Sequence, residues 1–86
     1  IMKHIRSNFK YPAIPKEMGI SEKIFVQFVI DKAGRITKAL VVRGEDKHLK
    51  EEALRLVNSI PKLQAAKQRG KPVPCSFTVP INFKLQ

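Results

Sequence analysis

The side chains best suited to nucleophilic, acid–base or metal chemistry in this sequence are His4, His48 and Cys75. Nucleophilic catalysis requires a cysteine or serine beside a base, and a third group that orients the base. Neither histidine has a supporting acidic residue at a recognisable spacing, and the three residues lack the paired ligands of zinc or iron sites. The sequence therefore predicts that the protein is not an enzyme and holds no cofactor and no metal ion.

The single cysteine has a structural interpretation. Cys75 falls on the apolar side of an alternating stretch, where a free cysteine behaves as a small buried hydrophobic residue. We therefore expect Cys75 to be buried and to react slowly with thiol reagents. A lone cysteine also excludes a disulfide within the chain.

The net charge is +10, because 17 Lys and Arg face only seven Asp and Glu. A charge of this size raises the question of a nucleic-acid or anionic membrane partner. The cations are spread along the sequence, and no arginine-rich block, zinc spacing or RNA-binding aromatic motif accompanies them. We favour a solvated basic surface without specific nucleic-acid recognition, and keep a basic nucleic-acid-binding domain as the alternative.

The 86 residues, of which 43% are apolar, are enough for one domain with one core, so we treat residues 1–86 as a single domain. No apolar run approaches the roughly 18 to 20 residues needed to cross a bilayer. The opening "IMKHIRSNF" has no signal-peptide pattern and begins inside a helical pattern. We expect a fragment of a longer chain, with any membrane anchor upstream.

Hydrophobic periodicity predicts the elements of the first half of the chain. Apolar residues at i, i+4 and i+8 indicate a short helix over residues 1–9, which must end before Pro12. Strict alternation then indicates a buried strand over residues 23–30. The turn "DKAGR" places Gly34 where a short hairpin needs a residue with positive φ, and residues 36–43 form the second strand.

The second half returns to helical periodicity. Its apolar positions are Leu49, Ala53, Leu56, Val57 and Ile60. Asp46 is the expected N-cap, and Glu51 and Arg55 form a favourable i,i+4 pair. Pro61 ends the helix, and a basic loop over residues 62–71 follows.

The closing stretch "CSFTVPINFKLQ" alternates between apolar and polar residues from Cys75 to Gln86. This pattern is typical of a strand with one buried face. Pro80 has no N–H to give to a sheet, which excludes a central place. The predicted fold class is α+β: a short N-terminal helix, a β-hairpin, a helix and a C-terminal edge strand. Together they make a three-stranded antiparallel sheet with helices packed on one face.

The open edge is the feature that looks most like a binding surface. Unpaired strand edges are usually shortened, covered or blunted by charge. Here Pro80 and Lys84 blunt only the later part of the strand, while residues 76–79 stay free of proline. A partner strand can pair with these residues.

Several segments resemble the TonB C-terminal domain family, and the resemblance covers essentially the whole chain. The most specific are Tyr11-Pro12 with Gly19 seven residues after the proline, the hairpin "FVIDKAGRI", the helix start "EEAL", Ile60-Pro61 and the closing "PINFKL". The resemblance implies a periplasmic domain anchored to the inner membrane through an upstream segment. Such a domain passes energy from the proton-motive force to outer-membrane receptors for iron complexes, vitamins or glycans.

In that family the receptor's N-terminal TonB box adds as a strand beside the last strand of the domain. The resemblance places this pairing edge on Cys75, Ser76, Phe77, Thr78, Val79 and Pro80, with Tyr11 and Pro12 near the incoming segment. The chain departs from the family pattern at Pro15 and Glu22, where alanine and glycine are usual, and at Leu63 and Ala65, where tryptophan and proline are usual. These departures put the identity of the partner in doubt and leave the fold intact.

Our leading hypothesis is a non-enzymatic domain of a TonB-type energy transducer in the Gram-negative envelope. Its partners are TonB-dependent outer-membrane receptors and, through upstream regions, the energy-harvesting complex of the inner membrane. The alternative is the same fold as an interaction or sensor module of another envelope protein. An open edge also admits pairing with a second copy of the chain to form a homodimer.

Overall fold

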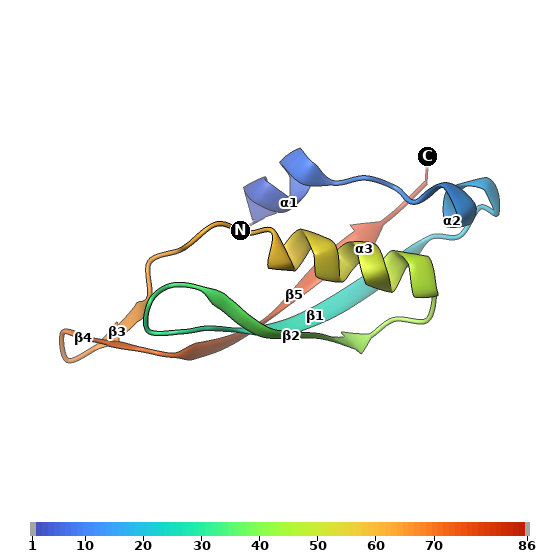
Figure 1. The fold of residues 1–86 in the computed structure, drawn as a ribbon. Coiled ribbons are helices and arrows are strands. Elements are labelled where there is room, and N and C mark those ends of the chain that lie inside the picture. The colour runs from blue at the N-terminus through green and yellow to red at the C-terminus, as the bar shows by residue number, and fades with distance from the viewer. Residues whose placement is uncertain (1, 86) are drawn as a thin grey trace.

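The structure is a computed structural model, and it describes residues 2–85. Its elements are α1 (Met2–Asn8), α2 (Ala13–Glu17), β1 (Glu22–Ile30), β2 (Ile36–Arg43), α3 (Lys47–Asn58), β3 (Ala66–Gln68), β4 (Lys71–Val73) and β5 (Cys75–Phe83). The helices lie on one side of the sheet formed by β1, β2 and β5, and the β3–β4 hairpin projects from one end (Figure 1). The shape is long and thin, with extents of 49 × 23 × 16 Å.

The three-stranded sheet is antiparallel and has the order β2-β1-β5, so the predicted α+β fold and the edge position of the last strand are confirmed. β1 and β5 pair without interruption from Glu22 opposite Phe83 to Ile30 opposite Cys75. The β1–β2 ladder has two register shifts, and Lys38 beside one of them has a positive φ of 53°. The β1–β5 pair is therefore the regular part of the sheet.

The core lies between the sheet and the helices, and it matches the alternation and helical spacing of the sequence. It comprises Ile5, Ile24, Val26, Phe28, Ile30, Leu49, Ala53, Leu56, Val57, Ile60, Ile81 and Phe83. The face of β1 predicted to be buried and the apolar stripe of α3 meet here, as expected for one core. Each aliphatic or aromatic side chain that is fully removed from water contributes about 1.5–3 kcal/mol.

The N-terminus of α3 is capped as predicted: Asp46 Oδ2 accepts a hydrogen bond from the Leu49 N–H at 2.9 Å. The predicted ion pair between Glu51 and Arg55 is wrong. Arg55 pairs with Glu52 instead, at 2.6 Å between Nε and Oε1. Glu52 is the better placed carboxylate because it faces the N-terminal segment, where it also accepts from the Lys10 N–H.

The proline-rich stretch after residue 10, which carried no predicted element, contains the short helix α2. Proline is tolerated there because the N–H groups of a first helical turn have no partner within the helix, and Pro15 is buried. The helix ends at Glu17 with Met18 as its C-cap, and Gly19, the next residue, has a φ of +70°. Gly19 and Ile20 donate their N–H groups back to the carbonyls of Lys16 and Pro15, a Schellman motif that needs a left-handed residue.

The prediction of a basic loop over residues 62–71 is wrong in its second half, where β3 and β4 form a hairpin. Arg69 and Gly70 both have positive φ at its tip, which is the geometry of a tight two-residue turn. The strands are only three residues long and rich in Lys and Gln, so they have no apolar alternation to reveal them.

Candidate functional site: the open edge of β5

The direction of the backbone groups on β5 follows from the β1–β2 hairpin. Asp31 donates its N–H to the Arg35 carbonyl at 2.9 Å, and the Val29 carbonyl accepts from Thr37 Oγ1 at 3.2 Å. The odd-numbered residues at this end of β1 therefore face β2. Since successive residues of a strand point to opposite neighbours, the even-numbered residues of β1 face β5. They pair there with Cys75, Phe77, Val79 and Ile81.

The even-numbered residues of β5 consequently turn their backbone groups to the open edge. Ser76, Thr78 and Asn82 present both an N–H and a carbonyl, whereas Pro80 presents only a carbonyl. Pro80 costs the sheet no hydrogen bond, because its nitrogen points away from β1. At about 3.3 Å per residue, the donor-free gap between Thr78 and Asn82 is about 13 Å long.

The side chains at the start of β5 differ from expectation in their burial. Cys75 and Phe77 lie on the core face, opposite Ile30 and Phe28. Nevertheless Cys75 is only partly buried and Phe77 is 41% exposed, so the prediction of a buried Cys75 is wrong. The reason is coverage: the end of the sheet where β5 begins extends past α3 (Figure 1). The face assignment is correct, but no helix covers that end.

Tyr11 and Pro12 lie away from residues 75–80. The Tyr11 ring packs edge-on against Phe83, at the far end of β5, with 5.7 Å between centroids, and its hydroxyl donates to the Ile20 carbonyl. Phe9 completes this aromatic cluster, at 5.1 Å from Phe83. Pro12 is the N-cap of α2 and borders a hollow on α3. The cluster anchors the N-terminal segment to the end of β5.

Helix α1 is held against α3 by hydrogen bonds between residues far apart in the chain. Ser59 Oγ donates to the Leu56 carbonyl, so it accepts from His4 Nε2, which lies 3.0 Å away. Arg55 Nη2 donates to the Asn8 carbonyl at 2.9 Å. The sequence predicted none of these contacts between α1 and α3, since nothing local in the sequence pairs His4 with Ser59.

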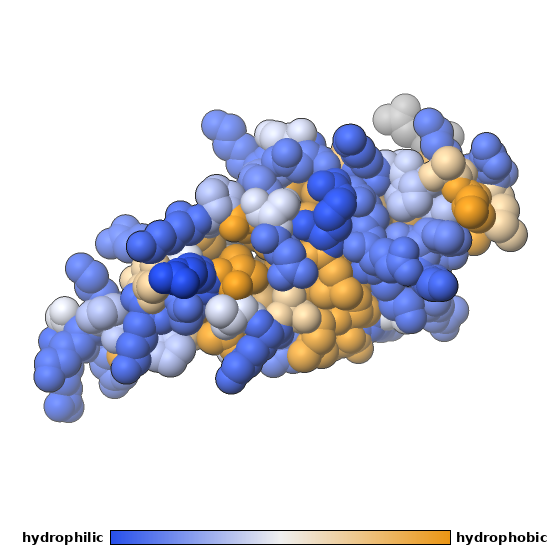
Figure 2. All heavy atoms as spheres, viewed as in Figure 1, coloured by the Kyte–Doolittle hydropathy of each residue, from blue (hydrophilic) through white to orange (hydrophobic). Residues whose placement is uncertain are grey.

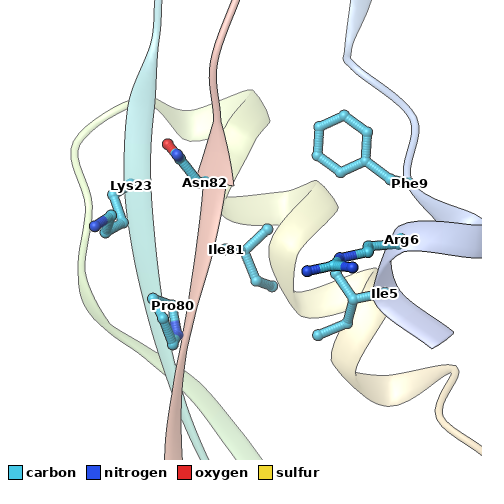
Figure 3. A pocket seen from close by; sticks show the side chains of 7 residues that line it. All are labelled: Ile5, Arg6, Phe9, Lys23, Pro80, Ile81 and Asn82. Carbon is cyan, nitrogen blue, oxygen red and sulfur yellow. The ribbon is translucent and has the colours of Figure 1, made fainter. Parts of the chain in front are cut away.

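Fixing α1 leaves a groove of about 450 Å³ between that helix and β5. Its lining residues are Ile5, Arg6, Phe9, Lys23, Pro80, Ile81 and Asn82. Figure 3 shows Ile5, Arg6 and Phe9 facing Ile81 across the opening. The groove is thus continuous with the open edge at Pro80.

The β1–β2 turn is tied to the loop that follows α3. Leu63 donates its N–H to the Gly34 carbonyl at 2.6 Å, and Gly34 is buried with a φ of +84°. Leu63 itself packs against the core. The link is made by main-chain atoms, so it does not depend on an aromatic side chain at this position.

The same turn supplies a pH-dependent contribution to stability. Asp31 Oδ1 accepts from the N–H groups of Arg35 and Ala33, both at 2.9 Å, and the bond from Arg35 is the main cause that lowers the Asp31 pKa below its usual 3.8. A depressed folded-state pKa stabilises the fold above pH 3.8, and this contribution is lost as the pH falls through the folded-state value.

Asp31→Asn removes this titrating group, so between pH 7 and pH 3 we expect the variant to lose less free energy of unfolding than the wild type loses below about pH 4. Urea unfolding of both proteins at pH 7 and pH 3 measures the two losses of unfolding free energy. Equal losses in the wild type and the variant would contradict the prediction.

The projecting end of the molecule is basic. The β3–β4 hairpin carries Lys67, Arg69 and Lys71, and hydrophilic side chains dominate this end in Figure 2.

Across residues 2–85, no group of three or more His, Cys, Asp or Glu is placed to hold a metal ion. Within the same residues no helix is both long and apolar enough to cross a membrane.

A three-stranded antiparallel sheet whose last strand lies at an open edge, with helices on one face and an adjoining groove, defines the class of small α+β interaction domains. Comparison with protein families is consistent with this class: the model of the Gram-negative bacterial TonB protein C-terminal family matches residues 7–85. The chain belongs to this family. It is accordingly a periplasmic protein-interaction domain of the Gram-negative envelope, of the type that serves energy transduction and transport.

Solved structures show the same fold. The chain is similar to the NMR solution structure of the Helicobacter pylori TonB C-terminal domain, residues 179–285, with 23% identity and a TM-score of 0.76 over 99% of this chain and 77% of that one. The shorter H. pylori domain, residues 194–285, gives 24% identity and a TM-score of 0.63 over 98% and 90% of the two chains. A comparison with curated proteins gives no match.

Proposed function

We propose that this domain is the receptor-binding end of a TonB-type energy transducer and that it performs no catalysis. It binds the TonB box of outer-membrane receptors as a fourth strand on the open edge of β5. The observation that carries this proposal is the pair of outward-facing donors and acceptors at Ser76 and Thr78, on an edge that no element of the described structure pairs with. Upstream regions link the domain to the inner-membrane complex that harvests the proton-motive force.

Strand addition suits a protein that pulls on its partner. A row of main-chain hydrogen bonds shares a force along the docked strand, and it depends little on the partner's side chains. The pairing of β5 with β1 runs unbroken from Glu22 to Ile30. Force applied to β5 is therefore passed directly to the central strand and the core beneath it.

The test is an NMR titration with TonB-box peptides from the same cell. In the free domain, the amide protons of Ser76 and Thr78 should exchange quickly with solvent, while those of Phe77 and Val79 are protected by β1. On binding, the even-numbered amides should become protected and their signals should shift. Shifts confined to residues 62–71, with β5 silent, would mean that the edge is not the site.

Two other uses of the fold give different results. A sensor or interaction module would share the edge but follow an upstream sequence with several transmembrane helices instead of one helix and a Pro/Lys-rich spacer. Homodimerisation through the edge would protect the Ser76 and Thr78 amides without peptide, as a function of protein concentration. Analytical ultracentrifugation over a concentration series separates this case from receptor binding.

A further inference from the structure

The fold gathers cations from two separate segments at one end of the molecule. The segments are the β1–β2 turn, residues 31–35, and the loop with the β3–β4 hairpin, residues 62–73. They lie side by side because the Leu63 N–H donates to the Gly34 carbonyl at 2.6 Å, and because β5, which follows the hairpin, starts opposite Ile30. We call their six cations the basic end: Lys32, Arg35, Lys62, Lys67, Arg69 and Lys71.

The charges of the basic end are not used to hold the fold together. All six side chains are exposed. Within residues 2–85 the only salt bridge joins Arg55 to Glu52, so no carboxylate of the described chain pairs with these cations. The one acid in the two segments is Asp31, and its Oδ1 is turned into the β1–β2 turn, where it accepts the N–H groups of Ala33 and Arg35. The basic end therefore presents its charge to solvent.

The other acidic residues lie toward the opposite end of the long axis. Glu22, at the start of β1, accepts the N–H groups of Glu45 and Asp46, which precede α3. In Figure 1, α2 and the start of α3 lie far from the β3–β4 hairpin, in a molecule 49 Å long. The six acids of this half are Glu17, Glu22, Glu45, Asp46, Glu51 and Glu52. The positive charge is thus concentrated where the hairpin projects.

The shape of the basic end suits a flat partner. The β3–β4 hairpin projects from the molecule (Figure 1), and none of the four most pronounced hollows among residues 2–85 is lined by a residue of the basic end. The two segments also contain no aromatic side chain on which a base could stack. A protruding cluster of Lys and Arg without a pocket is complementary to a plane of anionic groups. In the periplasm, membrane leaflets with phosphate head groups form such planes.

We propose that the basic end docks on the surface of an anionic phospholipid bilayer. Its Lys and Arg side chains lie among the head-group phosphates, and each cation close to such a surface strengthens binding by about fivefold. The contact is electrostatic, so salt screens it. It uses side chains at one end of the molecule and leaves the outward main-chain groups of Ser76 and Thr78 free. The inference therefore goes beyond strand addition and does not depend on it.

The test is flotation with vesicles of phosphatidylethanolamine and phosphatidylglycerol, and with vesicles of phosphatidylcholine alone. The wild type should float with the anionic vesicles, lose this binding at high salt, and not float with phosphatidylcholine. The triple variant Lys67→Gln, Arg69→Gln, Lys71→Gln should bind the anionic vesicles about 100-fold more weakly, because it removes three of the six cations.

The matched control is the triple variant Lys16→Gln, Lys23→Gln, Lys47→Gln. It removes the same charge from exposed positions at the opposite end, so its vesicle binding should stay within about twofold of the wild type. Equal weakening of the two triple variants would show that binding follows net charge alone and would overturn the proposal. Equal flotation with phosphatidylcholine would exclude an electrostatic contact. Sedimentation with purified peptidoglycan, without binding to vesicles, would make the cell wall the partner and also overturn it.

Discussion

Thr78→Pro will leave a folded domain that binds receptor peptides about 10- to 100-fold more weakly. The Thr78 N–H faces the open edge, so the substitution removes no hydrogen bond of the β1–β5 ladder. It removes a donor that the incoming strand needs, and it places a ring against that strand. Isothermal titration calorimetry with a TonB-box peptide measures the loss.

The matched control is Thr78→Val, which changes the side chain and keeps the N–H. It should bind the peptide as the wild type does. Ser76→Pro should behave like Thr78→Pro, because residues two apart on a strand face the same neighbour. Phe77→Pro should destabilise the domain, since the Phe77 N–H faces β1. Equal binding by Thr78→Pro and Thr78→Val would exclude pairing at this edge.

Gly34→Ala will destabilise the domain by about 2–4 kcal/mol. A Cβ built at Gly34 would lie 1.7 Å from the Leu63 carbonyl oxygen, and the φ of +84° disfavours every residue with a side chain. The backbone of the Leu63 loop must move, and its hydrogen bond to the Gly34 carbonyl is lost with it. Since a domain of this size loses about 4–8 °C per kcal/mol, the melting temperature should fall by about 10–30 °C.

Gly70→Ala is the control for backbone strain alone. Gly70 has a nearly identical φ of +78°, but nothing lies within 4 Å of the added Cβ. Its substitution should cost only about 1–2 kcal/mol. Thermal unfolding of both variants, followed by circular dichroism, gives the comparison. If the two variants melt together, the close approach of Leu63 to Gly34 is not present in solution.

The edge of β5 and the Gly34–Leu63 contact have different roles in the domain. The first is left open, and its binding capacity can be changed without loss of the fold. The second closes the turn of the β1–β2 hairpin onto the chain after α3, so it joins segments that the sheet alone does not connect. Peptide binding should respond strongly to substitutions at Thr78, and stability to those at Gly34.

The sequence by itself determined the features that depend on a few neighbouring residues. Pro80 lacks an N–H, and this alone excluded β5 from the centre of the sheet. Asp46 and Gly34 identified a helix start and a turn through their local hydrogen-bonding and φ preferences. The alternation of β1 and the helical spacing of α3 identified the faces that form the core, because side-chain direction follows from the local backbone.

Only the tertiary structure decided how much of each face is covered. Cys75 lies on the predicted face but is partly exposed, because coverage depends on where α3 ends over the sheet. In the same way, Glu52 rather than Glu51 pairs with Arg55, since the N-terminal segment packs on that side of the helix. Local periodicity predicts the face on which a side chain lies, but it does not predict which other element covers that face.

The groove beside Pro80 also arises only in three dimensions. Its walls come from opposite ends of the chain, and His4 and Ser59, which hold α1 in place, are 55 residues apart. The outward direction of the Thr78 N–H likewise required the register of β5 on β1, which starts from the hydrogen bonds of the β1–β2 hairpin. Both are long-range relations, formed when the core closes, and a short window of sequence contains neither.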